Sequence, residues 1–316
     1  TQSRSVILTM APTVQALLVS TALIATYYVS AQDYDLIKCD EPEICANITE
    51  AFTTSDGMEC SNYVSCASSS FNATCTENEC SLKCTESAAC IQSDFRFDGL
   101  SKLECTAWWA CRQSQFAIET PENGLTIECD GSFSCAGINA EIYGILDELK
   151  CDGSAVCSSA RIQTLALNEV NCNGYFSCWG FSVDVLYGST TPLKVNCKGQ
   201  EACFAMGLEY GVSDDEVAEL GIESIKCEEV AACEFAEIII TNDASEEVVI
   251  EELACSGFLS CAGLQIVAPN ANVRIKKCVC DDDNEDGYAC ICTQGLEICD
   301  EIDGVWNQAG TDQFPC

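Results

Sequence analysis

The chain has 316 residues, of which 28 are cysteine and none is histidine, and its 50 acidic and 14 basic residues give a formal net charge of −36. This charge excludes nucleic acid and anionic lipid surfaces as natural partners, because both are negative. So many cysteines indicate disulfides formed in an oxidising compartment, and 48 % hydrophobic residues are enough for a folded core. We therefore expect a secreted, extracellular or cell-surface protein.

The N-terminal segment has the pattern of a secretion signal. Met10 precedes an apolar run over residues 16–29 that is too short to span a bilayer comfortably and ends in small residues before Gln32. We interpret residues 1–31 as upstream residues plus a signal peptide, and expect no membrane association after its cleavage. An uncleaved signal anchor is the alternative, because the residues after Met10 lack the usual positive charge.

Ten cysteine pairs with the spacing C-x5-C divide the following chain into repeats of 21 to 30 residues, the length of one solenoid coil. Two positions before the first cysteine every repeat has an aliphatic residue or methionine, and the residue between is polar in nine of the ten. This alternation predicts a strand whose cysteine points inward. The pairs are Cys39/Cys45, Cys60/Cys66, Cys84/Cys90, Cys105/Cys111, Cys129/Cys135, Cys151/Cys157, Cys172/Cys178, Cys197/Cys203, Cys227/Cys233 and Cys255/Cys261.

A second strand is predicted after each pair, because apolar residues recur five and seven positions after the second cysteine, as at Phe95 and Phe97 or Ile238 and Ile240. The connection between the strands has the pattern of a tight corner that requires a left-handed residue. Two positions after the first cysteine stand Asn62, Gly131, Gly153, Gly174, Gly199 and Gly257. We predict an all-β fold: a single-chain parallel β-helix, a right-handed β-solenoid of about ten disulfide-bearing coils over residues 32–276.

Both cysteines of a pair are expected to face inward across one corner, which favours a disulfide within each coil. Closing so short a loop stabilises a coil by about 2 kcal/mol. Bonding between adjacent coils is the alternative.

The corners also hold the candidate binding residues. Tyr63, Trp108, Tyr175 and Phe258 stand three positions after the first cysteine and are expected to form a broken exposed row. Aromatic faces of this kind stack on sugars or on partner proteins. Packing against adjacent corners is the alternative. The next residue in each corner is expected to point inward, as at Val64, Trp109, Phe133, Phe176 and Leu259.

Residues 277–316 are predicted to form a cysteine-rich C-terminal cap. Asp282, Asn284 and Asp286 alternate before a glycine, which is a spacing suited to Ca²⁺, although Thr293 replaces the glutamate that ends an EF-hand loop. A plain acidic turn is the alternative. The cysteines around this loop are expected to form a disulfide knot, with a zinc site as the alternative.

Two glycosylation sequons begin at Asn47 and Asn72, in the first two coils. Both asparagines are expected to point outward, which is consistent with a eukaryotic secretory route and a glycoprotein.

The run Cys-Asp-Gly-Ser-Phe-Ser-Cys-Ala-Gly-Ile at residues 129–138, echoed at 151–157, 172–181 and 255–264, resembles the cysteine-rich parallel β-helix repeats of secreted and cell-surface proteins of protists and algae. The resemblance covers residues 37–268 and implies the fold, whereas many such proteins have no assigned activity. The C-x5-C coils are also similar to those of β-helical antifreeze proteins of beetles. Acidic residues, lysine and asparagine occupy the places where an ice-binding face needs threonine, so ice binding is not expected.

We therefore expect a non-enzymatic structural, adhesion or glycan-binding solenoid of the cell surface or extracellular matrix. Its expected partners are extracellular glycans, other surface or matrix proteins, or further copies of itself, and Ca²⁺ is the one expected cofactor. The alternative is a carbohydrate-active β-helix enzyme, a polysaccharide lyase or hydrolase, that uses a carboxylate pair. Absence of histidine disfavours the enzyme, because histidine is the commonest acid–base group.

Overall fold

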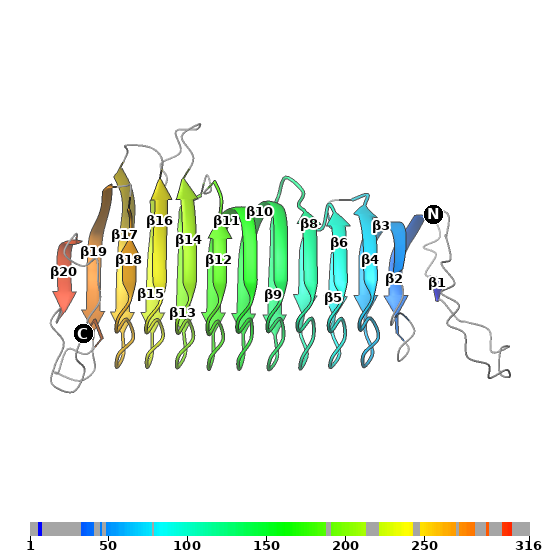
Figure 1. The fold of residues 1–316 in the computed structure, drawn as a ribbon, viewed down its shortest axis with the longest axis horizontal. Helices are drawn as coiled ribbons and strands as arrows, with labels where there is room; N and C mark the ends of the chain where they lie inside the picture. Colours follow the sequence, from blue (N-terminus) through cyan, green and yellow to red (C-terminus); the bar gives the residue numbers. More distant parts are fainter. Residues whose placement is uncertain are drawn as a thin grey trace.

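The computed structural model describes residues 6–7, 33–40, 45, 49–77, 79–187, 191–212, 221–242, 247–269, 272–281, 289–290 and 299–304. Within these ranges every regular element is a β-strand, and every strand pairing is parallel. The strands stack along one axis to form an elongated β-solenoid (Figure 1). The predicted fold class is thus confirmed.

One face of the solenoid is a parallel sheet that carries the first cysteine of each pair, and we call it the cysteine sheet. Successive strands pair in the order of the chain. The order is β2 (Asp33–Cys39), β3 (Thr49–Cys60), β5 (Ser81–Cys84), β7 (Lys102–Cys105), β9 (Leu125–Asp130), β10 (Asn139–Asp152), β11 (Arg161–Asn173), β13 (Leu193–Lys198), β15 (Gly221–Glu228), β17 (Glu247–Ser256), β19 (Asn272–Asp281) and β20 (Cys299–Gly304). A two-residue strand, β1 (Val6–Ile7), pairs with β2.

A second parallel sheet, the opposite sheet, follows the disulfide-bearing corners. It contains the first parts of the long strands β3, β10 and β11, which then continue into the cysteine sheet. Its other strands are β4 (Ser70–Cys75), β6 (Asp94–Asp98), β8 (Gln115–Glu119), β12 (Ser182–Val185), β14 (Gly207–Val212), β16 (Glu237–Asn242) and β18 (Gln265–Val267). In Figure 1, the corners align along the lower edge, where the cysteine-sheet strands end and the opposite strands begin.

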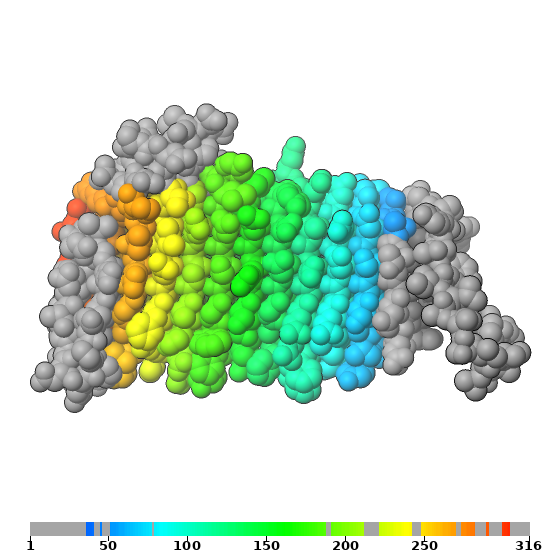
Figure 2. Space-filling view, in the orientation of Figure 1, coloured from blue at the N-terminus to red at the C-terminus, as the bar shows by residue number. Residues whose placement is uncertain are grey.

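The register keeps equivalent residues in line from coil to coil, so the first cysteines form one continuous column. Cys39 pairs with Cys60, and the column continues through Cys84, Cys105, Cys129, Cys151, Cys172, Cys197, Cys227, Cys255 and Cys280. Figure 2 shows the coils as adjacent bands along the rod. The column extends past residue 276, and β20 adds a further strand beyond β19.

The core lies between the two sheets and is made of side-chain columns. The aliphatic residues two positions before the first cysteine are all buried, from Ile37 to Leu253, and so are Phe95, Phe97 and Ile240 of the opposite sheet. Phe71, Phe95 and Phe116 stack with ring centroids 5.5 and 5.4 Å apart. A single coil has no second layer to cover these residues, so stacking is what buries them.

All ten C-x5-C pairs form disulfides within one coil, with Cα atoms 5.7 to 6.1 Å apart. Sulfur atoms of neighbouring coils lie within 4.8 Å of each other, as for Cys39, Cys60 and Cys66. Because these sulfur atoms are bonded to each other in pairs, the column is a stack of disulfides and not a set of free metal ligands.

The backbone at the second cysteine differs between coils, although the C-x5-C spacing is identical. In four coils this cysteine has a left-handed φ of 52 to 59°, namely at Cys90, Cys111, Cys135 and Cys157. The N–H of Cys111 donates to the Ala89 carbonyl of the preceding coil. Four other second cysteines, Cys178, Cys203, Cys233 and Cys261, do not adopt a positive φ, and their N–H groups donate to the following coil at 2.6 to 2.8 Å. The peptide group before each of these four cysteines is therefore turned over relative to that before Cys111, Cys135 and Cys157.

The corner is more strongly left-handed than the glycine pattern predicts. Gly131, Gly153, Gly174, Gly199 and Gly257 have φ between 98 and 122°, as expected. Non-glycine residues adopt left-handed φ at two further positions, four and eight residues after the first cysteine. The first set, with φ of 49 to 62°, is Val64, Ala88, Trp109, Phe133, Ala155, Phe176, Glu201, Ala231 and Leu259.

Two sequence predictions about the corner are therefore wrong. Asn62 does not adopt a positive φ, and its side chain bridges coils by donating from Nδ2 to the Asp40 carbonyl at 2.8 Å. The residues expected to point inward, Val64, Trp109, Phe133, Phe176 and Leu259, are half-buried or exposed. Their left-handed backbone breaks the alternation, so the next residue points inward instead, as at Ala110, Ser134 and Ser177.

Candidate functional site

Exposed aromatic side chains gather on the edge formed by the stacked corners, which we call the corner edge. Tyr63 is 61 % exposed, Trp108 50 % and Tyr175 47 %. Phe258, the fourth residue predicted for this row, is half-buried. Each of these residues stands one position before a left-handed residue, so the backbone directs its side chain away from the core.

The structure adds aromatic residues that the sequence did not assign to this edge. Phe133, Trp179 and Phe235 are exposed there, four, seven and eight positions after a first cysteine. Trp179 and Phe235 lie beyond the second cysteine of their coils, in a segment that the alternation pattern assigned to no element, whereas Phe133 had been predicted to point inward. The edge therefore carries more apolar surface than the predicted row.

Pairs of aromatic rings brace each other within the edge. The Trp108 and Trp109 rings stack with centroids 4.2 Å apart, and the Tyr175 and Phe176 rings lie 4.0 Å apart. The Arg112 guanidinium lies 5.2 Å from the Trp109 ring centroid, a cation–π arrangement. These contacts order the rings, which reduces the entropy lost when a flat ligand binds.

The cysteines predicted as site residues belong to the scaffold beneath this edge and not to its surface. Cys203, Cys233 and Cys261 are buried, and they bond with Cys197, Cys227 and Cys255 respectively. A buried disulfide offers no thiolate for catalysis or metal binding. Their role is therefore to hold the corners that carry the exposed rings.

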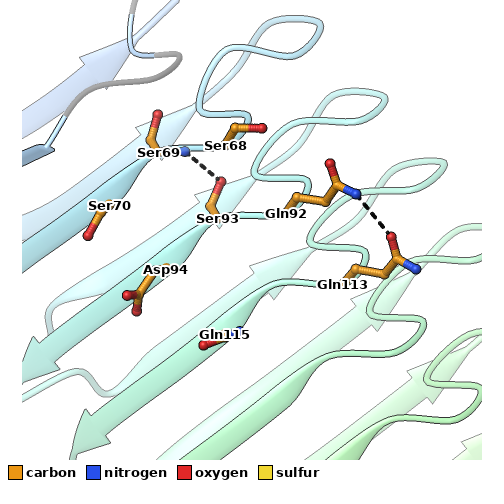
Figure 3. A pocket seen from close by; sticks show the side chains of 8 residues that line it. All are labelled: Ser68, Ser69, Ser70, Gln92, Ser93, Asp94, Gln113 and Gln115. Atoms are coloured by element: carbon orange, nitrogen blue, oxygen red, sulfur yellow. Dashed lines mark hydrogen bonds between the residues drawn. The ribbon is translucent and has the colours of Figure 1, made fainter.

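A shallow polar groove of about 400 Å³ lies beside the corner edge, where three corners enter the opposite sheet (Figure 3). It crosses the coils that begin at Cys60, Cys84 and Cys105. Its lining is Ser68, Ser69, Ser70, Gln92, Ser93, Asp94, Gln113 and Gln115.

The floor of the groove is fixed by serine hydroxyls that bond to the backbone. Ser69 Oγ donates to the Cys45 carbonyl, and Ser93 Oγ donates to the Cys66 carbonyl at 2.5 Å. At the rim, Gln92 Nε2 donates to Gln113 Oε1 at 3.3 Å, which aligns the two amides on successive coils (Figure 3). The groove thus presents ordered amides and hydroxyls, groups that both donate and accept hydrogen bonds.

Basic side chains are concentrated away from this edge. Every lysine of the sequence lies in a strand of the cysteine sheet, from Lys38 in β2 to Lys277 in β19. Most of them form salt bridges with acidic residues on neighbouring strands. The Nζ atoms of Lys102 and Lys150 both lie 3.2 Å from a carboxylate oxygen of Glu128. Hydrogen bonds from Lys102 and then Lys150 hold the pKa of the Glu128 carboxyl below its ordinary value.

One carboxyl group on the corner edge has a raised pKa. Burial raises the pKa of Glu234, and the neighbouring Glu201 carboxylate raises it further. Phe235 directly follows Glu234, and Phe204 is three residues after Glu201; the two rings meet edge to face with centroids 5.6 Å apart. A carboxyl group that holds its proton more firmly is the type of group a glycosidase uses as an acid.

Several predicted site residues lie outside the described residues, namely Asn47, Asp282, Asn284 and Asp286. Asn72 is described: it lies in β4 and is exposed, as predicted. Near the cap, Cys278 bonds with Cys299, and Cys280 bonds with Cys290. An unpredicted disulfide, Cys75–Cys80, closes the turn between β4 and β5.

The chain was also compared with known proteins. No family model, curated protein or solved structure matches it. The repeat pattern and the geometry above are therefore the basis for assigning a function. The described residues include no apolar helix of membrane-spanning length.

Proposed function

We propose that this protein is a secreted, non-enzymatic structural or adhesion rod of the cell surface or extracellular matrix, which binds extracellular glycans or other surface proteins along its corner edge. The observation that carries the proposal is the row of exposed aromatic residues on a disulfide-stapled scaffold. Aromatic faces that are held in place by a rigid scaffold stack on sugar rings and on protein partners.

The composition and fold support the extracellular setting. Every described cysteine is disulfide-bonded, which suits an oxidising environment. The resemblance of the C-x5-C coils to repeats of secreted protist and algal proteins agrees with this setting. Secretion, occupied sequons at Asn47 and Asn72, Ca²⁺ at the Asp282 loop and self-assembly of the rods belong to the same proposal.

The aromatic contribution is tested by a glycan array and by binding to extracellular matrix extract. The variant is Trp108→Ala/Tyr175→Ala, and the control is Tyr187→Ala, an exposed tyrosine beyond β12 and away from the corners. We expect binding to weaken at least tenfold in the double variant, because each stacked ring contributes about 1 kcal/mol, and to be unchanged in the control. Equal binding by all three proteins would contradict the role of the corner edge.

The alternative is a carbohydrate-active enzyme, and the raised pKa of Glu234 is the observation that favours it. The assay is release of reducing ends or of unsaturated sugars from neutral and acidic polysaccharides. Turnover that disappears in Glu234→Gln would establish the enzyme and refute the non-enzymatic rod. Binding without turnover would support the rod.

A further inference from the structure

We propose that the polar groove of the Cys60, Cys84 and Cys105 coils binds a neutral polysaccharide chain that runs along the rod axis. This inference rests on the proposed glycan-binding function and deepens it, because it assigns the ligand class and a site distinct from the aromatic row. The groove lies between the corner edge and the outer face of the opposite sheet.

The hydrogen-bonding groups of the groove match sugar hydroxyls. The bond between Gln92 and Gln113 uses one N–H of the first amide and the carbonyl of the second. The Gln92 carbonyl and the Gln113 amino group are thus left to face a ligand, one as acceptor and one as donor. Sugar hydroxyls both donate and accept, so one hydroxyl can satisfy either group.

The spacing of the groove matches a polymer rather than a single sugar. Equivalent positions repeat on successive strands at about 4.8 Å, which is close to the length of one pyranose unit in an extended chain. Gln92 and Gln113 occupy one such column, and Asp94 and Gln115 occupy a second. In the next coil the position equivalent to Gln113 is Gly137, which has no side chain. The groove therefore accommodates about three sugar units.

Charge argues against an acidic chain, and seven of the eight lining residues are neutral. Asp94 is the one charged residue in the lining, and a net charge of −36 opposes the approach of a polyanion. The basic group nearest in sequence, Arg112, lies over the Trp109 ring, and neither residue lines the groove. Ordered amides and hydroxyls, with one carboxylate among them, suit the hydroxyl edge of a neutral pyranose.

The test is calorimetric titration of the full disulfide-bonded protein with soluble hexasaccharides. The probes are neutral (cellohexaose, laminarihexaose and N-acetylchitohexaose), acidic (hexagalacturonate) and cationic (chitosan hexamer). The variant is Gln92→Ala/Gln113→Ala. The matched control is Gln163→Ala/Gln265→Ala, which removes two exposed glutamines from other coils of the same sheet. Thermal unfolding verifies that both proteins are folded.

We expect at least one neutral hexasaccharide to bind the wild type, with an affinity that hardly changes with salt. The dissociation constant should rise about tenfold in Gln92→Ala/Gln113→Ala and stay within twofold in the control. Equal affinity in the groove variant, or tighter binding of hexagalacturonate or chitosan hexamer, would overturn the inference. Loss of binding in Trp108→Ala/Tyr175→Ala alone would refute the groove and leave the proposed function standing, whereas absence of any glycan binding by the wild type would refute both the groove and glycan binding.

Discussion

At the residue scale, the buried position five residues after the first cysteine holds serine in some coils and alanine in others, and the two have different effects on stability. Ser134 Oγ is buried and has no hydrogen-bond partner among the described residues, whereas other coils have Ala89, Ala110 or Ala202 at this place. A buried hydroxyl without a partner costs about 1 to 3 kcal/mol. Ser134→Ala should therefore raise the free energy of unfolding by about 1 kcal/mol in urea titration.

The matched control is Ser114, whose buried Oγ donates to the Cys90 carbonyl. Ser114→Ala removes that bond and leaves the carbonyl without the hydroxyl, so it should lower the free energy of unfolding by about 1 kcal/mol. If both substitutions changed the free energy of unfolding in the same direction, the structure would be wrong that one hydroxyl is hydrogen-bonded and the other is not.

A second residue-scale prediction concerns backbone handedness in the corner. Glu229 has φ of 82° at the place where neighbouring coils have Gly199 and Gly257. A left-handed non-glycine residue costs about 1 to 2 kcal/mol, so Glu229→Gly should stabilise the protein by about 1 kcal/mol in thermal unfolding.

The converse change is Gly174→Ala. Its Cβ would lie 2.5 Å from the Gly153 carbonyl oxygen, and the residue would also be strained at φ of 116°. We expect this substitution to lower the free energy of unfolding by about 2 kcal/mol. A Gly174→Ala protein that is more stable than the wild type, or a Glu229→Gly protein that is less stable, would contradict the corner geometry.

At the element scale, the disulfides of the corners and of the β4–β5 turn close loops of similar length in different surroundings. Cys129 and Cys135 are fully buried in the core, whereas Cys75 is half-buried. Each bond should contribute about 2 kcal/mol through the unfolded chain. Cys129→Ala/Cys135→Ala should lower the free energy of unfolding more than Cys75→Ala/Cys80→Ala, because it also leaves a cavity in the core. A larger loss for the turn pair in urea unfolding would refute this order.

The ionic ladder on the cysteine sheet gives an element-scale pH dependence. The pKa of Glu128 is lowered in the folded state, so its ion pairs stabilise the fold above the ordinary glutamate pKa of 4.5, and this contribution is lost as pH falls through the folded pKa. Because the pair is solvent-screened, Glu128→Gln should cost about 0.5 kcal/mol at pH 7.

The cost of Glu128→Gln should vanish well below pH 4.5 and shrink in high salt. The control is Glu122→Gln in the exposed turn after β8, which removes the same charge and should leave the free energy of unfolding at pH 7 unchanged. A cost for Glu128→Gln that grows as pH falls would have the wrong sign for this ladder.

The strands were predictable from sequence, but the corner was not. Alternation around Leu103 and Cys105 specifies which side chains face the core, since a strand has a period of two. Left-handed residues such as Trp109 and Gln113 break this period, and their side chains give no local signal of it. The aromatic row was therefore predicted in part, from Tyr63, Trp108 and Tyr175, whereas the groove depends on the inter-coil register and was not predicted.

At the scale of the whole molecule, stability and binding both follow from stacking. The cysteine column from Cys39 to Cys280 keeps each coil in register with the next, so corner side chains separated by more than 20 residues in sequence become neighbours. A repeat array of this type behaves as a chain of nearest-neighbour interfaces. A ligand lying along the rod can therefore contact several coils while each coil contributes one or two side chains.

The most direct test of the account is non-reducing peptide mapping of the purified protein by mass spectrometry. The structure predicts that each first cysteine of a C-x5-C pair bonds with the cysteine six positions later, as Cys105 does with Cys111, and that Cys75 bonds with Cys80. Peptides that link different coils, such as Cys105 with Cys129, or free thiols at these positions, would contradict the stacked solenoid and the edge built on it.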